Sequence, residues 1–345
     1  MAERTIPTRM GDGSLARMTP SEIRQDLEDG TATAAQRAKL PPLAADELDH
    51  LYDIFASPAR FSSVDIGDEV VLTYDGTGVP QQGGRVDALY QTEQLFGADS
   101  CELYHADYSY RAVKTVVPYE QQQMKEAQQR VTIPVHYGAQ PDLGRYSRPD
   151  GPVGNWSELL PAMRIDEARA AQEEAVEMAV ADMVYVAEGM WEAGADGIDF
   201  DTCGAAGDAD FLAALKAVET LRARHPDLGI EVGMAGEVVL GTHGQLEYKG
   251  VRLAGLKPEG QVQVAQKAGA TVYGPAVNVN TGKSTAWNMS RALTFVKPCM
   301  AVAEIPVHMN VGMGVGGVPM ASYTPLDAVA RCSRACVDVL RLDGL

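Results

Sequence analysis

The sequence is poor in positive charge. It has 29 lysine and arginine residues against 47 aspartate and glutamate residues, so its formal net charge is -18. A surface of this sign repels phosphate backbones and anionic lipids, and we therefore expect neither nucleic acid nor a membrane as a partner. The same acidity attracts small cations such as an alkylammonium, although adaptation to a salt-rich cytosol would produce it equally.

Long hydrophobic runs are also missing. No stretch of about twenty apolar residues occurs, so no segment is predicted to span a bilayer. The five cysteines are widely spaced, and no charged-then-apolar leader opens the chain, which predicts a cytoplasmic protein in a reducing compartment. Cys332 and Cys336 stand four residues apart in a helical segment, and small core residues are a simpler interpretation of them than a metal site.

The beginning of the chain has an irregular pattern. Short helices are predicted at 21–28 and 44–55, and an alternating strand at 63–74 precedes the turn signal Asp75-Gly76. With 345 residues, of which 46% are hydrophobic, the chain can bury a sizeable core. We interpret residues 1–95 as an N-terminal cap region and 96–345 as the main domain.

From about Phe96 onward, helices alternate with short aliphatic runs, and a Gly-Ala-Asp step often joins them. Strands are predicted at 101–105, 132–136, 197–201, 229–233, 271–274 and 305–310. The clearest helices are predicted at 166–191, 210–224, 284–304 and 325–341. This alternation indicates an α/β protein with a parallel sheet, and the repeat favours a (β/α)8 TIM barrel over a doubly wound sheet.

The last residues read as the start of a further unit. Leu342-Asp343-Gly344-Leu345 repeats the pattern Asp196-Gly197-Ile198, which leads into a strand. A strand start without its continuation would leave backbone groups unpaired and an edge of the barrel open. We therefore expect the barrel to be incomplete at the C-terminus, with its last strands missing.

Candidate catalytic residues follow two of the predicted strands. In a barrel the functional residues lie at the carboxyl ends of strands, and Asp199 and Asp201 are two apart and so point to one face. Paired carboxylates can hold a cation or divide acid and base roles. Glu237 could act as a base or contact an ammonium group. Alternatively, one aspartate caps the next helix while the other meets a buried arginine, and Glu237 is a solvated loop acid.

Other polar residues near strand ends are candidates for ligand contact: His105, His136, Asn278, Asn280, His308 and Asn310. The histidines come from separate units without short spacing, so no metal site is predicted, and a structural histidine is the alternative for each. Asparagine is also a favoured turn residue.

A glycine-rich segment follows the last predicted strand. Gly312, Gly314 and Gly317 formally satisfy G-x-G-x-x-G, although no following strand supplies the acid of a dinucleotide site. Glycines here could let a phosphate or a flat macrocycle approach the backbone, or they could form an ordinary βα loop.

Together these motifs resemble the methanogen-type dimethylamine methyltransferases. The likeness runs from Arg9-Met10-Gly11-Asp12-Gly13 to the last residue. Its densest stretches are Asp199-Phe200-Asp201-Thr202 with Gly204-Ala205-Ala206-Gly207-Asp208, then Gly233-Met234-Ala235-Gly236-Glu237, and Gly312-Met313-Gly314-Val315-Gly316-Gly317. Asn310 departs from it, because we expect an acid at that position of the family pattern.

The resemblance implies a barrel that moves a methyl group from dimethylamine to the Co(I) corrinoid of a separate partner protein, in the methylamine metabolism of methanogenesis. The corrinoid would be carried by the partner and not bound tightly by this chain. Asp199, Asp201 and Glu237 would line the amine site. His105, His136, Asn278, Asn280, His308, Asn310, Gly312 and Gly314 would contact substrate or corrinoid. We also expect a homo-oligomer.

The family carries a genetically encoded pyrrolysine shortly after a segment resembling 337–345. Its imine is the electrophile to which the amine adds. We expect that an amber codon was read as a stop after Leu345, and that the chain as written is inactive. The alternatives are a real deletion that leaves a non-catalytic fragment able to bind the corrinoid protein, and a different TIM-barrel enzyme that binds a phosphorylated cofactor or substrate at the Gly312 loop.

Overall fold

The chain divides into two compact units in a computed structural model. The structure describes residues 4–57, 69–73, 80–84, 143–149, 151–195, 197–312, 314–321 and 324–345. The first unit comprises Met1–Val131, Asn278–Thr294 and Val311–Arg341, and the second comprises Thr132–Val277, Phe295–Asn310 and Leu342–Leu345. The predicted boundary between residues 95 and 96, the strands at 101–105 and 132–136, and with them His105 and His136, lie outside the described residues.

The first unit opens with a hairpin that the sequence reading missed. Strand β1 (Ile6–Arg9) pairs antiparallel with β2 (Leu15–Met18). The turn between them is held by Asp12, whose carboxylate accepts a hydrogen bond of 2.8 Å from the backbone N–H of Ser14. Since Asp-Gly is a favoured turn signal between strands, the dipeptide at 12–13 was the available clue.

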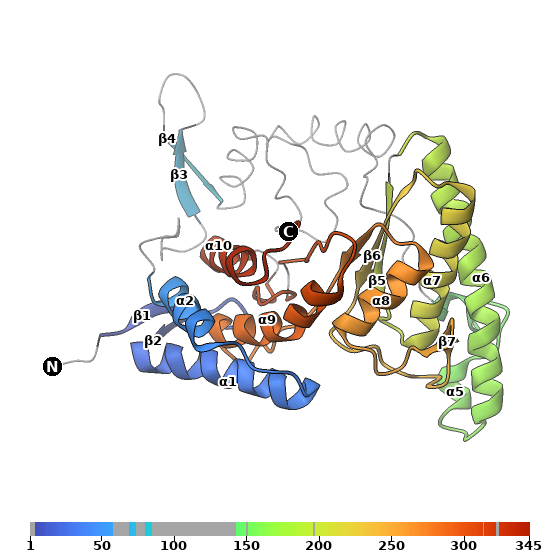
Figure 1. Ribbon diagram of the computed structural model, residues 1–345, viewed down its shortest axis with the longest axis horizontal. Helices are drawn as coiled ribbons and strands as arrows, with labels where there is room; N and C mark the ends of the chain where they lie inside the picture. Colours follow the sequence, from blue (N-terminus) through green and yellow to red (C-terminus); the bar gives the residue numbers. More distant parts are fainter. Residues whose placement is uncertain are drawn as a thin grey trace. The chain divides into compact units, whose positions relative to one another are not determined.

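Two helices follow the hairpin, and Figure 1 shows them in blue. Helix α1 (Pro20–Ala38) begins at a capping box in which Thr19 and Glu22 each bond the other's backbone. The prediction of a helix at 21–28 was too short, because buried residues continue at helical spacing to Ala38. Helix α2 (Ala45–Ala56) confirms the prediction at 44–55.

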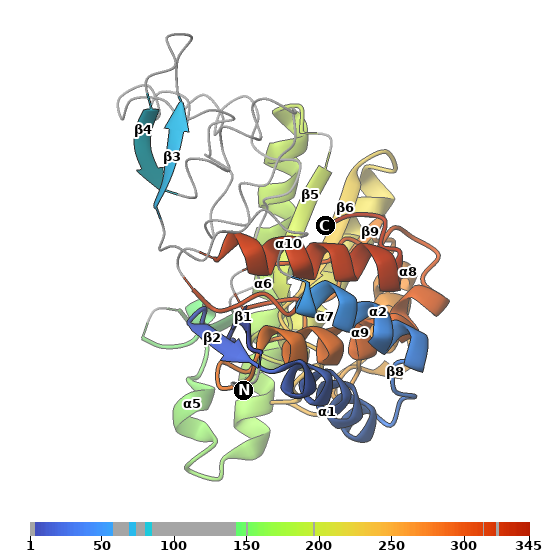
Figure 2. The same ribbon diagram turned by 90° about the vertical axis from the view of Figure 1, so that its left-hand side faces the viewer.

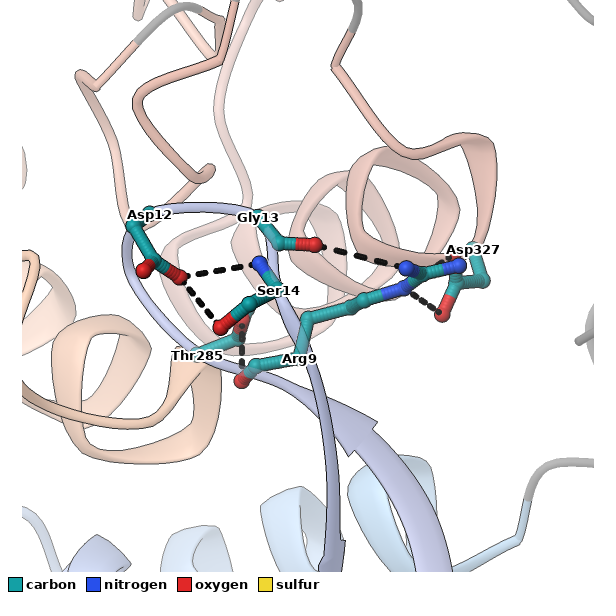
Figure 3. A network of polar contacts seen from close by, with 6 residues as sticks. All are labelled: Arg9, Asp12, Gly13, Ser14, Thr285 and Asp327. Atoms are coloured by element: carbon teal, nitrogen blue, oxygen red, sulfur yellow. Dashed lines mark hydrogen bonds and ion pairs between the residues drawn. The ribbon is translucent and has the colours of Figure 1, made fainter. Parts of the chain in front are cut away.

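An ion pair joins the hairpin to the C-terminal part of the first unit. Arg9 of β1 places its Nε 3.3 Å from each carboxylate oxygen of Asp327, which belongs to helix α10 (Leu326–Ala335), and its guanidinium also donates to the carbonyl of Gly13 (Figure 3). The hydroxyl of Thr285 donates to the Arg9 carbonyl at 2.9 Å. The polar contacts therefore tie three distant stretches of sequence together.

The C-terminal helix ends differently from the prediction at 325–341. After α10 the chain continues as a π-helical turn, η5 (Cys336–Leu340). Cys332 and Cys336 are fully buried there, which confirms them as core residues, and burial is the main cause that raises the pKa of both thiols. Strands β3 (Glu69–Thr73) and β4 (Pro80–Gly84) form a separate antiparallel pair.

The second unit is built on a parallel sheet with the order β5-β6-β9, and Figure 2 shows these strands in that order. The strands are β5 (Gly197–Cys203), β6 (Gly229–Met234) and β9 (Val272–Gly274), as predicted at 197–201, 229–233 and 271–274. The predicted strand at 305–310 is reduced to a parallel bridge between Val307 and Tyr273, and a further bridge joins His308 to Gly344. The strands therefore pair in chain order, and crossover segments connect them because all of them run parallel.

Helices α6 (Ile165–Glu192), α7 (Asp208–Arg224) and α8 (Pro258–Ala268) accompany this sheet (Figure 1). The first two confirm the predictions at 166–191 and 210–224, and α8 fits the predicted alternation of strands and helices, although no bounds were predicted for it. Helix α9 (Thr285–Val302), predicted at 284–304, contributes to both units. Shorter elements complete the second unit: η4 (Leu143–Tyr146), α5 (Trp156–Leu159), β7 (Glu247–Tyr248) and β8 (Val251–Arg252).

Along the strands of the second unit, apolar side chains on one face of the sheet alternate with mostly polar side chains on the other. One face carries apolar residues that are at most 1% exposed: Ile198, Phe200, Ile230, Val232, Tyr273 and Val307. The apolar stripe of α7, with Phe211, Leu215, Val218 and Leu221, is equally buried. The strand residues between the apolar ones face the other way, and they include the predicted catalytic aspartates.

The fold prediction is confirmed at the level of an α/β protein with a parallel sheet. The sheet formed by the described strands is open, and no closed barrel is seen within the described ranges. None of the helices in those ranges is long and apolar enough to cross a membrane.

Two helical glycines, one inside α1 and one in the last turn of α6, should respond to alanine in opposite directions. A methyl group on Gly30 of α1 would lie 2.3 Å from the backbone oxygen of Trp287, whereas one on Gly189 of α6 would meet nothing within 4 Å. We expect Gly30→Ala to destabilise by more than about 2 kcal/mol through overpacking. Gly189→Ala should stabilise by about 0.5–1 kcal/mol through helix propensity. Urea unfolding of both variants checks this, and equal effects would contradict the packing of α1.

Candidate active site

Two carboxylates converge over a glycine on the polar face of the second unit's sheet. Asp199 and Asp201 of β5 both lean over β6, because a methyl group on Gly233 would lie 3.2 Å from an oxygen of each. Asp199 is 7% exposed, and Asp201 is partly buried. Gly233 leaves the space that any larger residue would fill, so both acids can approach one small volume.

The end of β5 is distorted in a way that directs Asp201. The pairing of β5 with β6 shifts register between Phe200 and Cys203, and Thr202 has a φ of 54°, in the left-handed region. The Thr202 N–H donates to the Asp201 carboxylate at 2.6 Å. Bulges and strained residues of this kind recur beside active sites, where they re-aim a side chain.

A third acid and a histidine continue the polar face. Glu231 of β6 is the register partner of Asp199, and its Oε1 lies 2.9 Å from Nδ1 of His308. A methyl group on Gly274 of β9 would lie 3.2 Å from the same Glu231 oxygen, so this glycine also leaves room for an acid. The sequence reading included His308 but missed Glu231, although an acid between Ile230 and Val232 in an apolar strand was a visible signal.

The electrostatics of the face oppose full ionisation. Burial is the main cause that raises the pKa of Asp201, and the negative charge of Glu231 raises it further, while the hydrogen bond from Thr202 lowers it. Clustered acids with raised pKa values are a feature of sites that bind cations or transfer protons. Cys203 beside them is buried, which raises its thiol pKa well above the usual value, so it is a poor nucleophile.

The loops at the carboxyl ends of β5 and β6 are joined by Asp208. Its fully buried carboxylate accepts hydrogen bonds from the backbone N–H groups of His243 at 3.1 Å and Gly244 at 2.7 Å. At the start of α7, Asp210 accepts from the N–H of Ala206. Glu237 lies in the β6 loop and is 8% exposed, so it is not the solvated loop acid of the alternative interpretation.

The three predicted asparagines are all exposed. Asn278 and Asn280 belong to the first unit and are exposed. The Asn280 side chain accepts from the N–H of Gly282 at 3.0 Å, which is turn chemistry, and the Asn278 carbonyl accepts from Arg291. Asn310 is exposed at the end of the segment that contains His308.

The glycine-rich segment is a tightly hydrogen-bonded loop of the first unit. Gly314 has a φ of 84°, its N–H donates to the Val318 carbonyl at 3.1 Å, and its carbonyl accepts from Val279. A methyl group on Gly314 would lie 2.4 Å from Met320, and one on Gly317 would lie 3.0 Å from the Met289 backbone. Close internal packing therefore accounts for these glycines and supports the ordinary-loop interpretation.

The acidic face is suited to a small cation. Carboxylates accept hydrogen bonds from an ammonium group, and the apolar core behind the sheet holds them in place. Among the described residues, no three histidine, cysteine, aspartate or glutamate side chains form a group that could hold a metal ion. Fold and site together describe an α/β enzyme with an acid-rich site on the polar face of a parallel sheet.

Comparison with known families identifies the enzyme class further. The family model described as dimethylamine methyltransferase matches residues 4–345, and the chain belongs to this family. The resemblance inferred from the sequence motifs is thereby confirmed. A comparison with solved structures finds no match.

Replacing Asp201 should stabilise the protein at neutral pH. Because its folded-state pKa is raised, the wild-type protein loses stability as the pH rises through that pKa, and it is relatively most stable below the ordinary value of 3.8. Asp201→Asn keeps an acceptor for Thr202 but removes the charge, so we expect a gain of about 1 kcal/mol at pH 7 that disappears in acid. Urea unfolding at several pH values measures it. A loss of stability at pH 7 would contradict the assignment.

Proposed function

We propose that this protein transfers a methyl group from dimethylamine to the Co(I) corrinoid of a partner protein, in methylamine metabolism, and that the acidic face of the second unit binds the amine. Family membership supports the amine and the methyl transfer. The observation that carries the site is the convergence of Asp199 and Asp201 over Gly233.

The number of acceptors matches the substrate. Dimethylammonium carries two N–H donors and two methyl groups, and two carboxylates that reach one small volume can accept one hydrogen bond each. Both methyl groups then point away from the acids. Glu237, in the loop that follows β6, adds a further acid at this end of the sheet, which favours a cation over a neutral ligand.

Methyl transfer needs more than binding, because an amine is a poor leaving group. The pyrrolysine that the family resemblance implies would supply an electrophilic imine, and the partner's corrinoid would supply the methyl acceptor. The residues of this chain would bind the ammonium, orient one N–methyl bond and accept a proton, so that the nitrogen lone pair becomes available. Residues 1–345 contain no pyrrolysine. The active form in this proposal carries such a residue.

A TIM barrel is part of the same proposal. The strands and bridges of the second unit pair in parallel and in chain order, as they would in a barrel wall, whereas a doubly wound sheet reverses its order at a switch point. The bridge from His308 to Gly344 places the last residues next in that order.

Substitution of the paired aspartates should reduce methyl transfer. The assay uses the protein purified from its native host with its corrinoid partner in the Co(I) state, and it follows methylcobalt absorbance after dimethylamine is added. We expect Asp199→Asn and Asp201→Asn each to lower kcat/KM about 10- to 100-fold, the effect of losing a hydrogen bond to a charged group. Asp227→Asn is the matched control, because Asp227 is exposed and precedes β6 at the opposite end of the strand. Equal losses in all three variants would contradict the site.

Mass spectrometry gives a separate test. We expect the peptides of the protein purified from its native host to include one that carries pyrrolysine. A native protein without this residue that still demethylates dimethylamine would refute the role of pyrrolysine.

A further inference from the structure

A bulge at the end of β5 sets the position of Asp201. The register with β6 shifts between Phe200 and Cys203. The two residues between them, Asp201 and Thr202, therefore stand opposite the single residue Gly233. An extra residue of this kind bends a strand and re-aims its side chains, so we attribute the direction of the Asp201 side chain to the bulge.

Two hydrogen bonds hold the peptide groups on either side of Asp201. After the acid, the N–H of Thr202 donates to Asp201 Oδ1 at 2.6 Å. The same oxygen lies 3.2 Å from the position of a methyl group on Gly233. Before the acid, the thiol of Cys203 donates to the carbonyl of Phe200 at 2.8 Å. Because that carbonyl belongs to the peptide group that joins Phe200 to Asp201, the backbone is held on both sides of the acid.

We propose that Cys203 is a positioning residue of the amine site, whose thiol closes the bulge and thereby keeps the Asp201 carboxylate over Gly233. The inference rests on the proposed function for its effect on methyl transfer, and it names a residue that acts through Asp201. Cys203 is fully buried, and its own carbonyl accepts a hydrogen bond of 3.0 Å from the N–H of Ala235, the first residue after β6. The thiol is thus carried by a residue that the neighbouring strand holds in place.

The Cys203 thiol keeps its proton in this environment. Burial raises the pKa of Cys203 well above its usual value, and the negative charges of Asp210, Asp199 and Asp201 raise it further. A protonated thiol can donate a hydrogen bond, whereas a thiolate would add a negative charge beside the acids. The thiol therefore serves as a neutral donor next to the acidic face.

The conformation of Thr202 explains why the bulge needs a closing contact. A β-branched residue is unfavourable in the left-handed region, and Thr202 has a φ of 54°. Strained residues of this kind persist only where the surrounding structure determines them. The bond from the Cys203 thiol to the Phe200 carbonyl links the two ends of the bulge. We expect its loss to let Thr202 relax and to turn Asp201 away from Gly233.

The kinetic test compares two variants of Cys203 with a variant of another buried cysteine. In the methyl-transfer assay with protein from the native host and its corrinoid partner, we expect Cys203→Ala to lower kcat/KM about 3- to 10-fold, the effect of losing one hydrogen bond between uncharged groups. Cys203→Ser should restore kcat/KM to within about 2-fold of the wild-type value, because a hydroxyl donates well at 2.8 Å. Cys299→Ala is the matched control, because Cys299 is equally buried in the second unit but belongs to α9, and it should leave kcat/KM unchanged.

A double-mutant cycle shows whether the effect passes through Asp201. In the Asp201→Asn background, Cys203→Ala should change kcat/KM less than about 2-fold, because the group that Cys203 positions is already altered. If the full loss persists in that background, or if Cys299→Ala causes the same loss, the positioning role fails and the proposed function stands. If the wild-type protein transfers no methyl group, the proposed function fails, and titration of Asp201 still decides whether Cys203 positions it.

Titration of Asp201 reports on its carboxylate without turnover. NMR of protein with labelled aspartate follows the carboxyl groups, and the signal absent from Asp201→Asn identifies Asp201. Burial and the charge of Glu231 raise the pKa of Asp201 in every variant alike, whereas the hydrogen bond from Thr202 lowers it. We expect Cys203→Ala to raise this pKa further, because the bond from Thr202 is lost as the bulge relaxes, and Cys203→Ser and Cys299→Ala to leave it unchanged. An unchanged Asp201 titration in Cys203→Ala would overturn the positioning role whether or not the enzyme is active.

Discussion

Burial of carboxylates on one face of a parallel sheet is the constraint on which the second unit depends. Asp199 and Glu231 are nearly inaccessible to water, and burial of a carboxylate disfavours its ionised form. The opposite face offsets this cost, because Phe200, Val232 and their neighbours form a continuous apolar core. An apolar core of this size can keep in place a cluster of acids that would otherwise separate. In the proposed function, the positive charge of the bound amine offsets part of the negative charge of this cluster.

Much of this face could be predicted from the sequence, because strand periodicity and the position of strand ends are local signals. Asp199 and Asp201 were identified in this way, and the structure brings them together. Glu231 was missed although it is the register partner of Asp199, because only Glu237, in the loop after β6, was predicted there. The convergence over Gly233 could not be predicted, since it depends on a register shift and on a left-handed residue at Thr202. Neither feature has a recognisable signature in one sequence.

Long-range contacts explain the other differences between prediction and structure. The G-x-G-x-x-G match at Gly312 indicated a possible ligand loop, but its glycines make room for Met320 and Met289, which no local pattern reveals. Helix α1 extends well beyond its predicted end because its later turns pack within the first unit, where Thr31 shares a hydrogen bond with Thr294. Composition and periodicity therefore predicted the elements, while tertiary partners decided their lengths and roles.

The buried Asp208 has a consequence for attempts to change which amine the enzyme accepts. Its carboxylate holds two backbone groups of the β6 loop while its own backbone belongs to the start of α7. The two segments that border the acidic face are thus mechanically coupled. If only one of the two segments were replaced by that of a relative, the Asp208 carboxylate or the two backbone N–H groups would lose their hydrogen-bond partners. A chimera therefore has to carry both segments together.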